Sequence, residues 1–527
     1  MDCEENVIFG ECQNWTPPDQ PLGRYLLTQL KIHGDKIIQV YPQVSERLSA
    51  VALADRALHY AGALQSLGVQ PGDRVVVCCN YLPHFSAIVL ATICCGATCA
   101  PLNFKFDSGD LGRLLQVIKP KVIFTVPETL KELQIALHQQ ATAPTLIVFG
   151  EGETWQRFES AGNQNSFKEP VLSNVLTTTA VILCSSGTTG LPKGVCITHA
   201  NWFAALHTLK YKDSQVQPDD IMVLTSPPYW VTGVLYSFSS MEQGMCMVFE
   251  FGSSEERVLT SIQEHKATLL LTASNFLLSI AKHPSLDDYM LSSLTGLICG
   301  GGAMPADSEL FVKNRFRVPV IQAYGMTECL IISGAIYKGQ RKLGSVGTLT
   351  PTLKMKVVDI DTGLALDRNK PGEFVVKGPL ASPGYLDNPE ATATLFQTDG
   401  WTHTGDIGYV DDDGNIFVIG RIKDIIKYRG DHVSPVELES ILISHPDVLE
   451  AAVIGVPHPT DQEHPRAYVV RRPGTTITAD HLIHLVESRV AQHKHLRGGV
   501  QFLDALPKSA TGKISRIQLR HQLITEA

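Results

Sequence analysis

The 527-residue sequence lacks an excess of positive charge. Its 44 Lys and Arg are outnumbered by 53 Asp and Glu, which gives a formal net charge of -9. Nucleic-acid binding depends on clustered Lys and Arg that displace counterions from phosphates, so the charge balance argues against it. The 42 Gly and 30 Pro follow no period and hydrophobic residues make up 44%, which excludes collagen-like and disordered chains.

Cysteine patterns typical of zinc sites are also missing. None of the 12 cysteines follows Cys329, and no Cys-x-x-Cys pair occurs, so we interpret them as reduced, apolar core residues. The amino terminus has no basic segment followed by an apolar run, and the carboxyl terminus is not Ser-Lys-Leu. These absences predict a cytoplasmic protein without a secretory, mitochondrial or peroxisomal signal.

One stretch, residues 75–104, contains no Asp, Glu, Lys or Arg and must be compared with a membrane span. Pro83, Gly96 and Pro101 interrupt it too closely for an apolar helix of about 20 residues. We expect instead a buried unit with strand 75–77, turn 80–83, helix 84–95 and strand 97–102.

The order of the expected elements predicts an α/β fold. Apolar strand-like runs alternate with helical segments over the first 330 residues, which is typical of doubly wound α/β subdomains. Residues 344–419 contain short strands and turn signals, so we expect a small β subdomain there. After Gly420 the pattern predicts a small α+β unit, with a capped helix over 434–444. We therefore divide the chain into a large N-terminal body (1–419), a hinge (420–423) and a small, mobile C-terminal domain (424–527).

The segment 184–194, Cys-Ser-Ser-Gly-Thr-Thr-Gly-Leu-Pro-Lys-Gly, follows a predicted strand. Glycines let the backbone approach an anion, hydroxyls donate to phosphate oxygens and Lys193 supplies positive charge. The segment departs from the Walker pattern because Pro192 precedes the lysine and Gly194 follows it. The residues alone favour a phosphate-binding loop, and the alternative is a Gly/Ser/Thr-rich surface loop.

This segment closely resembles the phosphate-binding signature of the adenylate-forming enzymes, which include acyl-CoA synthetases, coumarate-CoA ligases, insect luciferases and peptide-synthetase adenylation domains. Further blocks occur in the family's order at 301–303, 322–328, 401–406, 420–424 and 507–513, so the resemblance covers nearly the whole chain. Segments 426–430 and 496–500 are most similar to the branch with beetle luciferases and plant coumarate ligases. The resemblance implies ATP, Mg²⁺ and CoA as cofactors and names the N-terminal body as the AMP- and acyl-binding domain.

The resemblance also implies roles for individual residues. Binding of the nucleotide and CoA is assigned to Ser185, Ser186, Gly187, Thr188, Thr189, Gly190, Lys193, Gly301, Gly302, Ala303, Gln322, Ala323, Tyr324, Gly325, Met326, Thr327, Asp406, Arg421, Lys427, Arg429 and Gly430. Tyr324 is expected to stack on adenine, and Asp406 to accept hydrogen bonds from both ribose hydroxyls. The expected catalytic residues are Lys513, Glu328, Thr327 and Lys193, and Thr327 and Glu328 also serve the metal ion. Taken alone, Asp406 would be an ordinary turn carboxylate, and Arg421 and Lys513 would be solvated surface residues.

The implied reaction has two halves that share one site. A carboxylate first attacks the α-phosphorus of ATP, and a thiol then attacks the acyl adenylate. Lys513 is expected to bridge the carboxylate and the α-phosphate in the first half. The C-terminal domain then rotates about the hinge at Lys423, so that the face with Lys427, Arg429 and Gly430 replaces Lys513.

The acyl pocket is expected to be apolar. The resemblance assigns it to Tyr229, Trp230, Val231, Thr232, Gly301, Cys329, Leu330, Ile331 and Ile332, although plain core packing explains any one of these residues as well. No Asp is present at 228–230 to pair with an α-amine, which disfavours an amino acid substrate. Beetle luciferases usually carry His where Trp230 stands and Arg where Ala205 stands, and both departures weaken a light-emitting interpretation.

Three hypotheses follow. The first is an ATP-dependent acid:CoA ligase acting on a hydrophobic carboxylic acid, with a medium- or long-chain fatty acid ahead of an aryl, coumarate-like acid. The second is a luciferase-like adenylating monooxygenase, and the third is a non-catalytic binding relic. Retention of Lys193, Glu328, Asp406, Arg421 and Lys513 counts against the relic.

Overall fold

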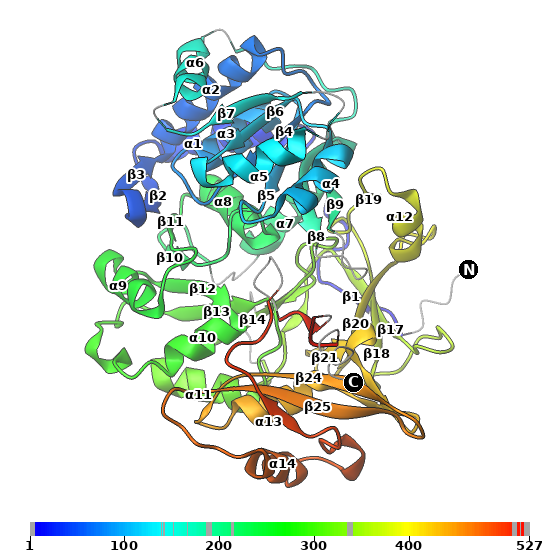
Figure 1. The fold of residues 1–527 in the computed structure, drawn as a ribbon. Coiled ribbons are helices and arrows are strands. Elements are labelled where there is room, and N and C mark those ends of the chain that lie inside the picture. Colours follow the sequence, from blue (N-terminus) through cyan, green and yellow to red (C-terminus); the bar gives the residue numbers. More distant parts are fainter. Residues whose placement is uncertain are drawn as a thin grey trace.

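The computed structural model describes residues 6–138, 140, 143–150, 152–165, 167–185, 192–211, 216–334, 341–508, 514–516 and 518–520. Within these residues the strands form four sheets, and helices separate and cover the two larger ones (Figure 1). The α/β class with a large N-terminal part and a small C-terminal part, predicted from the alternation of apolar runs, is confirmed.

A seven-stranded sheet has the order β19-β9-β8-β5-β4-β6-β7. Its middle strands are parallel, and β9 runs antiparallel to both β8 and β19. The bounds are β4 (Arg74–Cys78), β5 (Thr98–Leu102), β6 (Val122–Thr125), β7 (Thr145–Val148), β8 (Thr179–Ser185), β9 (Lys193–Thr198) and β19 (Gly384–Tyr385). The segment between β8 and β9 is the predicted phosphate-binding loop, so this sheet holds both ends of that loop.

A nine-stranded sheet has the order β16-β15-β14-β13-β12-β10-β11-β2-β3 and is parallel from β14 to β2. The bounds are β2 (Ile37–Tyr41), β3 (Glu46–Ser49), β10 (Ile221–Leu224), β11 (Cys246–Phe249), β12 (Leu269–Ala273), β13 (Gly296–Gly300), β14 (Val320–Tyr324), β15 (Ser333–Gly334) and β16 (Thr348–Leu349). The blocks 301–303 and 322–328 lie at the carboxyl ends of β13 and β14, the edge at which open α/β sheets usually bind ligands.

Two smaller sheets complete the chain. An antiparallel sheet contains β1 (Ile8–Phe9), β17 (Lys354–Val358), β18 (Gly372–Lys377), β20 (Thr402–Val410) and β21 (Ile416–Arg421). The C-terminal sheet contains β22 (Ile426–Tyr428), β23 (Asp431–Val433), β24 (Val448–His458), β25 (Gln462–Arg471) and β26 (Val500–Phe502). The short strands and turns expected over 344–419 include the hairpin of β20 and β21, which turns at Asp413 and Gly414.

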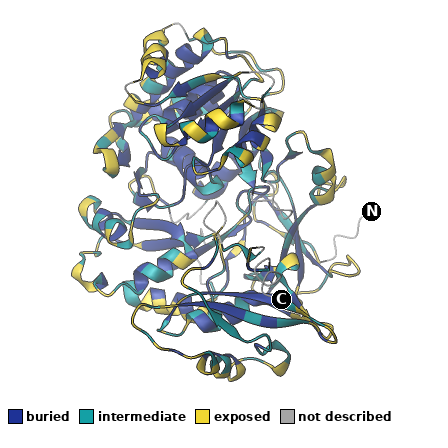
Figure 2. Ribbon diagram, viewed as in Figure 1, coloured by how far each residue is buried: buried dark blue, intermediate teal, exposed yellow. Residues whose placement is uncertain are grey.

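The helices fall into groups according to the face of a sheet that they cover. Bounds are α1 (Leu22–His33), α2 (Ala50–Ser66), α3 (Phe85–Cys94), α4 (Ser108–Ile118), α5 (Pro127–Leu137), α6 (Glu153–Ala161), α7 (His199–Lys210), α8 (Val231–Gln243), α9 (Glu255–His265), α10 (Ser274–Ala281), α11 (Ala306–Phe316), α12 (Pro389–Leu395), α13 (Pro435–Ile443) and α14 (Ala479–Glu487). In β4, Val75 and Val77 join the core with α1, α2, α3, α7 and α8, whereas Val76 and Cys78 face α4 and α5. Helices α9, α10 and α11 cover the outer face of the nine-stranded sheet. Buried strands and exposed outer helix surfaces follow this layering (Figure 2).

The charge-free stretch 75–104 forms the predicted strand-helix-strand unit, β4-α3-β5, and α3 is buried along its whole length. No helix in the described part of the chain is both long and apolar enough to cross a membrane. The cysteines that the structure describes are free thiols, and burial raises the pKa of Cys78 and Cys95 to about 12. Seven of these cysteines are buried, as expected for core residues, whereas Cys12, Cys184, Cys196 and Cys246 are half-buried.

The helix expected over 434–444 is α13, and Ser434 caps it as predicted, with its Oγ 3.4 Å from the Glu437 amide nitrogen. The Glu437 side chain takes a different partner from the one expected in a capping box. Its carboxylate binds the Lys494 ammonium at 2.7 Å. The same Ser434 hydroxyl donates to the Ile419 carbonyl at 2.7 Å, which ties the start of this helix to β21.

Candidate active site

Asp406 is the centre of a polar cluster that joins β14, β20 and β21. Tyr324 ends β14, and its hydroxyl donates to Asp406 Oδ2 at 2.8 Å. Arg421 lies directly across from Asp406 in the β20–β21 register, and its Nε donates to Oδ1 at 3.1 Å. Asp406 is 4% exposed, and burial together with its charge raises the pKa of Tyr324, which keeps the phenol protonated as a donor. Three residues that the sequence separated by up to 97 positions thus meet at one carboxylate.

A second cluster forms around Glu328. The Tyr385 hydroxyl donates to Glu328 Oε1 at 2.8 Å, and the Glu328 side chain lies in a buried position. Lys193 Nζ lies 5.2 Å from the centre of the Tyr385 ring, because β19 pairs with β9 near the start of that strand. Burial, and then the Glu328 charge, raise the pKa of Tyr385, so its hydroxyl remains a donor. Tyr385 therefore connects two residues that the sequence placed at the phosphates.

The phosphate-binding loop can be described only at its two ends. Ser185 pairs with Lys193 across the β8–β9 ladder, and its buried side chain also interacts with the Tyr385 side chain. Ser185 therefore lies beside Lys193 and Tyr385 at one end of the predicted loop. Ser186, Gly187, Thr188, Thr189, Gly190 and Lys513, all predicted site residues, lie outside the described residues.

The segment that follows β14 and carries Glu328 turns back sharply toward the end of that strand. The Ile332 amide donates to the Tyr324 carbonyl at 2.9 Å, and a Cβ on Gly325 would lie 2.0 Å from the Leu330 carbonyl oxygen. Only glycine fits at this close approach. Thr327 is half-buried beside Glu328, and Ala323 and Met326 are half-buried on the same turn.

The glycine block after β13 runs beside this turn. Gly300 approaches Ala323 closely, since a Cβ on it would lie 3.0 Å from the Ala323 carbonyl oxygen. Gly301 has a φ of 78° and, like Gly302, is exposed, whereas Ala303 is half-buried. The Ser274 hydroxyl fixes the block by donating to the Gly302 carbonyl at 2.6 Å.

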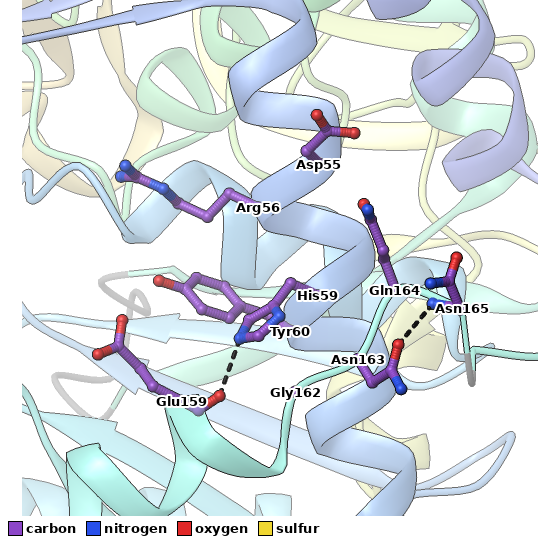
Figure 3. A pocket seen from close by; sticks show the side chains of 9 residues that line it. All are labelled: Asp55, Arg56, His59, Tyr60, Glu159, Gly162, Asn163, Gln164 and Asn165. Atoms are coloured by element: carbon purple, nitrogen blue, oxygen red, sulfur yellow. Dashed lines mark hydrogen bonds between the residues drawn. The ribbon is translucent and has the colours of Figure 1, made fainter.

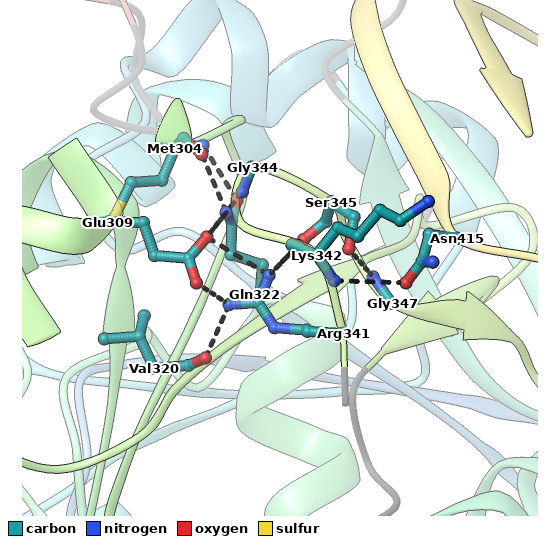
Figure 4. Close-up of polar contacts among 10 residues, drawn as sticks. All are labelled: Met304, Glu309, Val320, Gln322, Arg341, Lys342, Gly344, Ser345, Gly347 and Asn415. Carbon is teal, nitrogen blue, oxygen red and sulfur yellow. Dashed lines mark hydrogen bonds and ion pairs between the residues drawn. The ribbon is translucent and has the colours of Figure 1, made fainter. Parts of the chain in front are cut away.

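Gln322 is anchored in a network behind the site (Figure 4). Its amide group exchanges hydrogen bonds with the Met304 backbone at 2.7 and 2.9 Å and donates to Glu309 at 2.8 Å. Arg341 forms a buried ion pair with Glu309 and donates to the Val320 carbonyl at 2.6 Å. The network joins α11, β14 and the chain after 340, so in this structure the Gln322 side chain supports the site from behind.

Apart from the exposed Gly301, the expected acyl-pocket residues are buried or half-buried. Tyr229 is 7% exposed and meets Phe251 edge to face at 6.0 Å, and Trp230 precedes the first turn of α8. Thr232 Oγ1 is buried without a partner among the described residues. Cys329, Leu330 and Ile332 belong to the largest apolar core, and Val231 and Ile331 pack against it. Core packing and pocket lining therefore both agree with the positions of these five residues.

The predicted C-terminal site residues lie on an exposed face. Lys427, Arg429 and Gly430 are all exposed, and the Arg429 Nε donates to Asp461 at 2.7 Å. Lys423 lies in the short 3-10 turn Ile422–Asp424 between β21 and β22. His199, which the sequence left without a role, accepts from the Leu22 amide at 3.0 Å, and burial lowers its pKa to about 4.

Sequence reasoning missed Tyr385 and Phe251. Tyr385 lies 57 positions from Glu328, and Phe251 follows β11 while Tyr229 precedes α8, so no local pattern relates the partners. A surface pocket of about 550 Å³ between α2 and α6 is lined by none of the motif residues (Figure 3). Arg56, one of its lining residues, pairs with Glu46 at 2.9 Å.

Comparison with known proteins identifies the family. The model for AMP-binding enzymes matches residues 26–386, and the model for the C-terminal domain of AMP-binding enzymes matches 437–513. The chain belongs to the AMP-binding, adenylate-forming enzyme family. Relatives of this family include a luciferin 4-monooxygenase from Luciola mingrelica, which is 32% identical over 99% of this chain and 98% of its own. A probable 4-coumarate–CoA ligase from Dictyostelium discoideum is 31% identical over 95% of both chains.

Solved structures agree with this family and its fold. ATP-bound MatB from Rhodopseudomonas palustris superposes with a TM-score of 0.85 at 28% identity, covering 94% of this chain and 98% of its own. A Mycobacterium tuberculosis fatty acyl CoA synthetase superposes with a TM-score of 0.73 at 25% identity, covering 96% and 99%. The resemblance drawn from the sequence blocks is therefore confirmed.

Proposed function

We propose that this adenylate-forming enzyme is an AMP-forming acid:CoA ligase for a hydrophobic carboxylic acid. The observation that carries the proposal is the buried Asp406 of β20, held by Tyr324 at 2.8 Å and Arg421 at 3.1 Å beside the carboxyl end of the parallel strand β14. A carboxylate fixed in this way can accept both hydroxyls of a ribose. The relatives named as CoA ligases support the choice of CoA as the second substrate.

The proposed reaction balances in two steps. A carboxylate oxygen of the acid attacks the α-phosphorus of ATP, the bond to the β-phosphate oxygen breaks, and pyrophosphate leaves with the electron pair. The sulfur of CoA, as a thiolate, then attacks the acyl carbonyl, and AMP leaves with the electron pair of the broken acyl-oxygen bond. In this proposal Tyr324 stacks on adenine, and Lys193 with Ser185 and the loop 186–190 holds the phosphates.

Mg²⁺ fits the donors on the Glu328 side of the site. The buried carboxylate of Glu328 lies beside the half-buried Thr327, and this all-oxygen donor set is the kind that Mg²⁺ prefers. Bound there with ATP, the ion would neutralise phosphate charge. Tyr385 would orient the Glu328 carboxylate through its hydrogen bond.

We also propose the division into a body (1–419), a hinge (420–423) and a C-terminal domain (424–527). Support comes from the position of the 3-10 turn that contains Lys423, between the last strand of one sheet and the first of another. The exposed Lys427, Arg429 and Gly430 are available for CoA after rotation about this turn, and Lys513 would serve the first half-reaction.

An apolar acid is the substrate class that the pocket residues favour. Tyr229 and Phe251 form an aromatic wall, and Trp230 stands where a polar residue would suit a hydroxylated ligand. We place a medium- or long-chain fatty acid first. An aryl, coumarate-like acid is the second candidate because the same wall offers ring stacking and relatives carry that name.

The variant Lys513→Ala tests the two-step assignment. We expect it to abolish pyrophosphate release from ATP and acid, since no other residue is assigned to bridge the carboxylate and the α-phosphate. Thioester formation from supplied acyl adenylate and CoA should remain close to that of the unmodified enzyme. Rapid-quench measurement of both halves decides the matter, and an equal loss in both would refute the role of Lys513.

A further inference from the structure

The hairpin of β24 and β25 ends in a group of side chains that the proposed reaction does not use. Strand β24 ends at His458, β25 begins at Gln462, and the turn between them includes Asp461. The register pairs His458 with Gln462 and Val456 with His464. Opposite and alternate residues of an antiparallel pair share a face, so both histidines project from the same side.

The two imidazole rings stack, with centres 3.8 Å apart and planes 17° apart. The Asp461 carboxylate closes the group, with Oδ2 2.8 Å from His464 Nε2 and 3.6 Å from His458 Nδ1. The three atoms lie within 4.8 Å of one another. A nitrogen from each imidazole and an oxygen of Asp461 therefore lie close enough together to reach one ion once the rings turn out of their stacked arrangement.

This donor set matches a transition-metal ion of the zinc class. Metal–nitrogen and metal–oxygen bonds of about 2.0–2.2 Å in a tetrahedral site place neighbouring donors roughly 3.4 Å apart. The 3.6 Å separation already fits this geometry, and the 2.8 Å hydrogen bond needs to open by about half an ångström. Rotation of the two half-buried imidazoles out of their stack can supply that change without moving the strands.

The surroundings of the carboxylate are those of a supported metal ligand. Its second oxygen, Oδ1, accepts from the Arg429 Nε at 2.7 Å, and the Arg429 amide donates to the Asp461 carbonyl at 3.0 Å. Outer hydrogen bonds of this kind orient ligating carboxylates. The side chain of Asp461 is 9% exposed, that of His464 17% and that of His458 36%, so the group is open to water on one side.

A simple hydrogen-bonded turn is the alternative explanation. The Asp461 amide lies 3.3 Å from His458 Nδ1, which is enough to cap the turn. A cap of this kind requires one imidazole, however, and it does not require a second imidazole bonded to the same carboxylate.

We propose that His458 Nδ1, Asp461 Oδ2 and His464 Nε2 form a binding site for a divalent transition-metal ion at the tip of the β24–β25 hairpin. Water completes the coordination on the open side. The site is separate from the Mg²⁺ position proposed beside Glu328, and its existence does not depend on the proposed reaction.

Cobalt titration of the tag-free, full-length protein after chelation tests the site directly. We expect the visible absorption of tetrahedral Co²⁺ to saturate at one equivalent and to disappear when Zn²⁺ displaces it. His464→Gln keeps a donor toward Asp461 but removes a good ligand, so its affinity should fall more than about 100-fold, beyond the loss of an outer partner. His458→Ala should behave in the same way.

His484→Ala is the matched control because this exposed histidine of α14 pairs with Glu487 in the same domain. It should bind Co²⁺ like the unmodified protein. Circular dichroism and melting temperature check that each variant folds. Equal Co²⁺ uptake by His464→Gln and the unmodified protein would overturn the proposal, as would the absence of a one-equivalent site.

Hydrogen exchange gives a readout that is independent of enzymatic activity. Because Asp461 also holds Arg429, Zn²⁺ should slow amide exchange in peptides covering 458–464 and 428–430, and should leave α14 unchanged. In His464→Gln the same Zn²⁺ concentration should slow neither segment. Slowing that persists in this variant would contradict the assigned ligands.

Discussion

At the residue scale, Tyr385 is the side chain on which the phosphate side of the site depends. Its hydroxyl orients Glu328 at 2.8 Å, and its ring lies 5.2 Å from the Lys193 ammonium, within cation–π distance. A phenol whose pKa is raised by burial and by the Glu328 charge keeps its proton at neutral pH. Tyr385 is therefore a positioning residue for two groups proposed to contact ATP.

Replacing Tyr385 by Phe removes the hydrogen bond and keeps the ring. A hydrogen bond to a charged group contributes about 1.5–3 kcal/mol, so kcat/KM for ATP should fall about 10- to 100-fold in ATP–pyrophosphate exchange. The control is Tyr409→Phe, because this ring stacks on Phe417 at 4.8 Å, away from the site. The role assigned to the Tyr385 hydroxyl would be wrong if the two variants had the same kinetics.

At the scale of elements, the buried network of Figure 4 fixes β14 against α11 and the chain after 340. Glu309 accepts from Gln322 at 2.8 Å and from the Gly344 amide at 2.9 Å, besides its ion pair with Arg341. The Arg341 side chain is 11% exposed, so its charge depends on Glu309 for compensation. The Arg341–Glu309 ion pair therefore helps to hold β14, the strand that ends in Tyr324, in place.

Breaking the pair on one side should destabilise the protein more than removing both charges. Glu309→Gln leaves a buried guanidinium without its counter-charge, which costs about 3–5 kcal/mol, and a lower melting temperature in calorimetry should report it. The double variant with Arg341→Met should recover part of the loss, since a buried pair replaced by apolar groups is often neutral. Glu390→Gln, at an exposed site, is the control. Additive losses in the double variant would contradict the coupling.

The sequence predicted the elements better than their contacts. Unbroken apolar runs such as residues 75–77 identify buried parallel strands, and the glycine, hydroxyl and lysine pattern at 184–194 predicts an anion-binding loop. The meeting of Tyr385 with Glu328, and of Gln322 with Glu309, depends on strand pairings that join distant segments, such as β19 with β9. Spacing along the chain contains no signal for such pairings, so the sequence suggested that Gln322 binds the nucleotide, whereas its amide contacts Met304 and Glu309.

At the scale of the whole molecule, one lysine connects the two proposed domains. Lys282 follows α10 of the body, and its ammonium donates to the Ile443 carbonyl at the end of α13 at 3.0 Å. Desolvation, and then the nearby Arg472 charge, lower the pKa of Lys282 to about 8 from an ordinary 10.5. His445 also faces this lysine. The present arrangement of the domains therefore disfavours the charged form of Lys282.

This shift predicts how pH changes the balance between domain orientations. Below pH 8 the Lys282 ammonium is charged in both domain orientations, so the present orientation carries the full free-energy cost of desolvating that charge. As the pH rises from about 8 to 10.5, Lys282 loses its proton in the present orientation first, and this cost disappears. Fluorescence transfer between labels on α6 and α14 should shift toward the present orientation over this range. Lys282→Met should abolish the shift, whereas the exposed Lys313→Met should retain it. A shift of equal size in Lys282→Met would refute the assignment.

The most direct test of the central claim is product analysis over a panel of aliphatic and aryl carboxylic acids, with ATP and Mg²⁺, in the presence and absence of CoA. Pyrophosphate release and acyl-CoA are measured in the same samples. The account predicts that hydrophobic acids release pyrophosphate and that, with CoA present, the acyl-CoA formed equals the AMP formed. Pyrophosphate release from these acids without any thioester in the presence of CoA would contradict it.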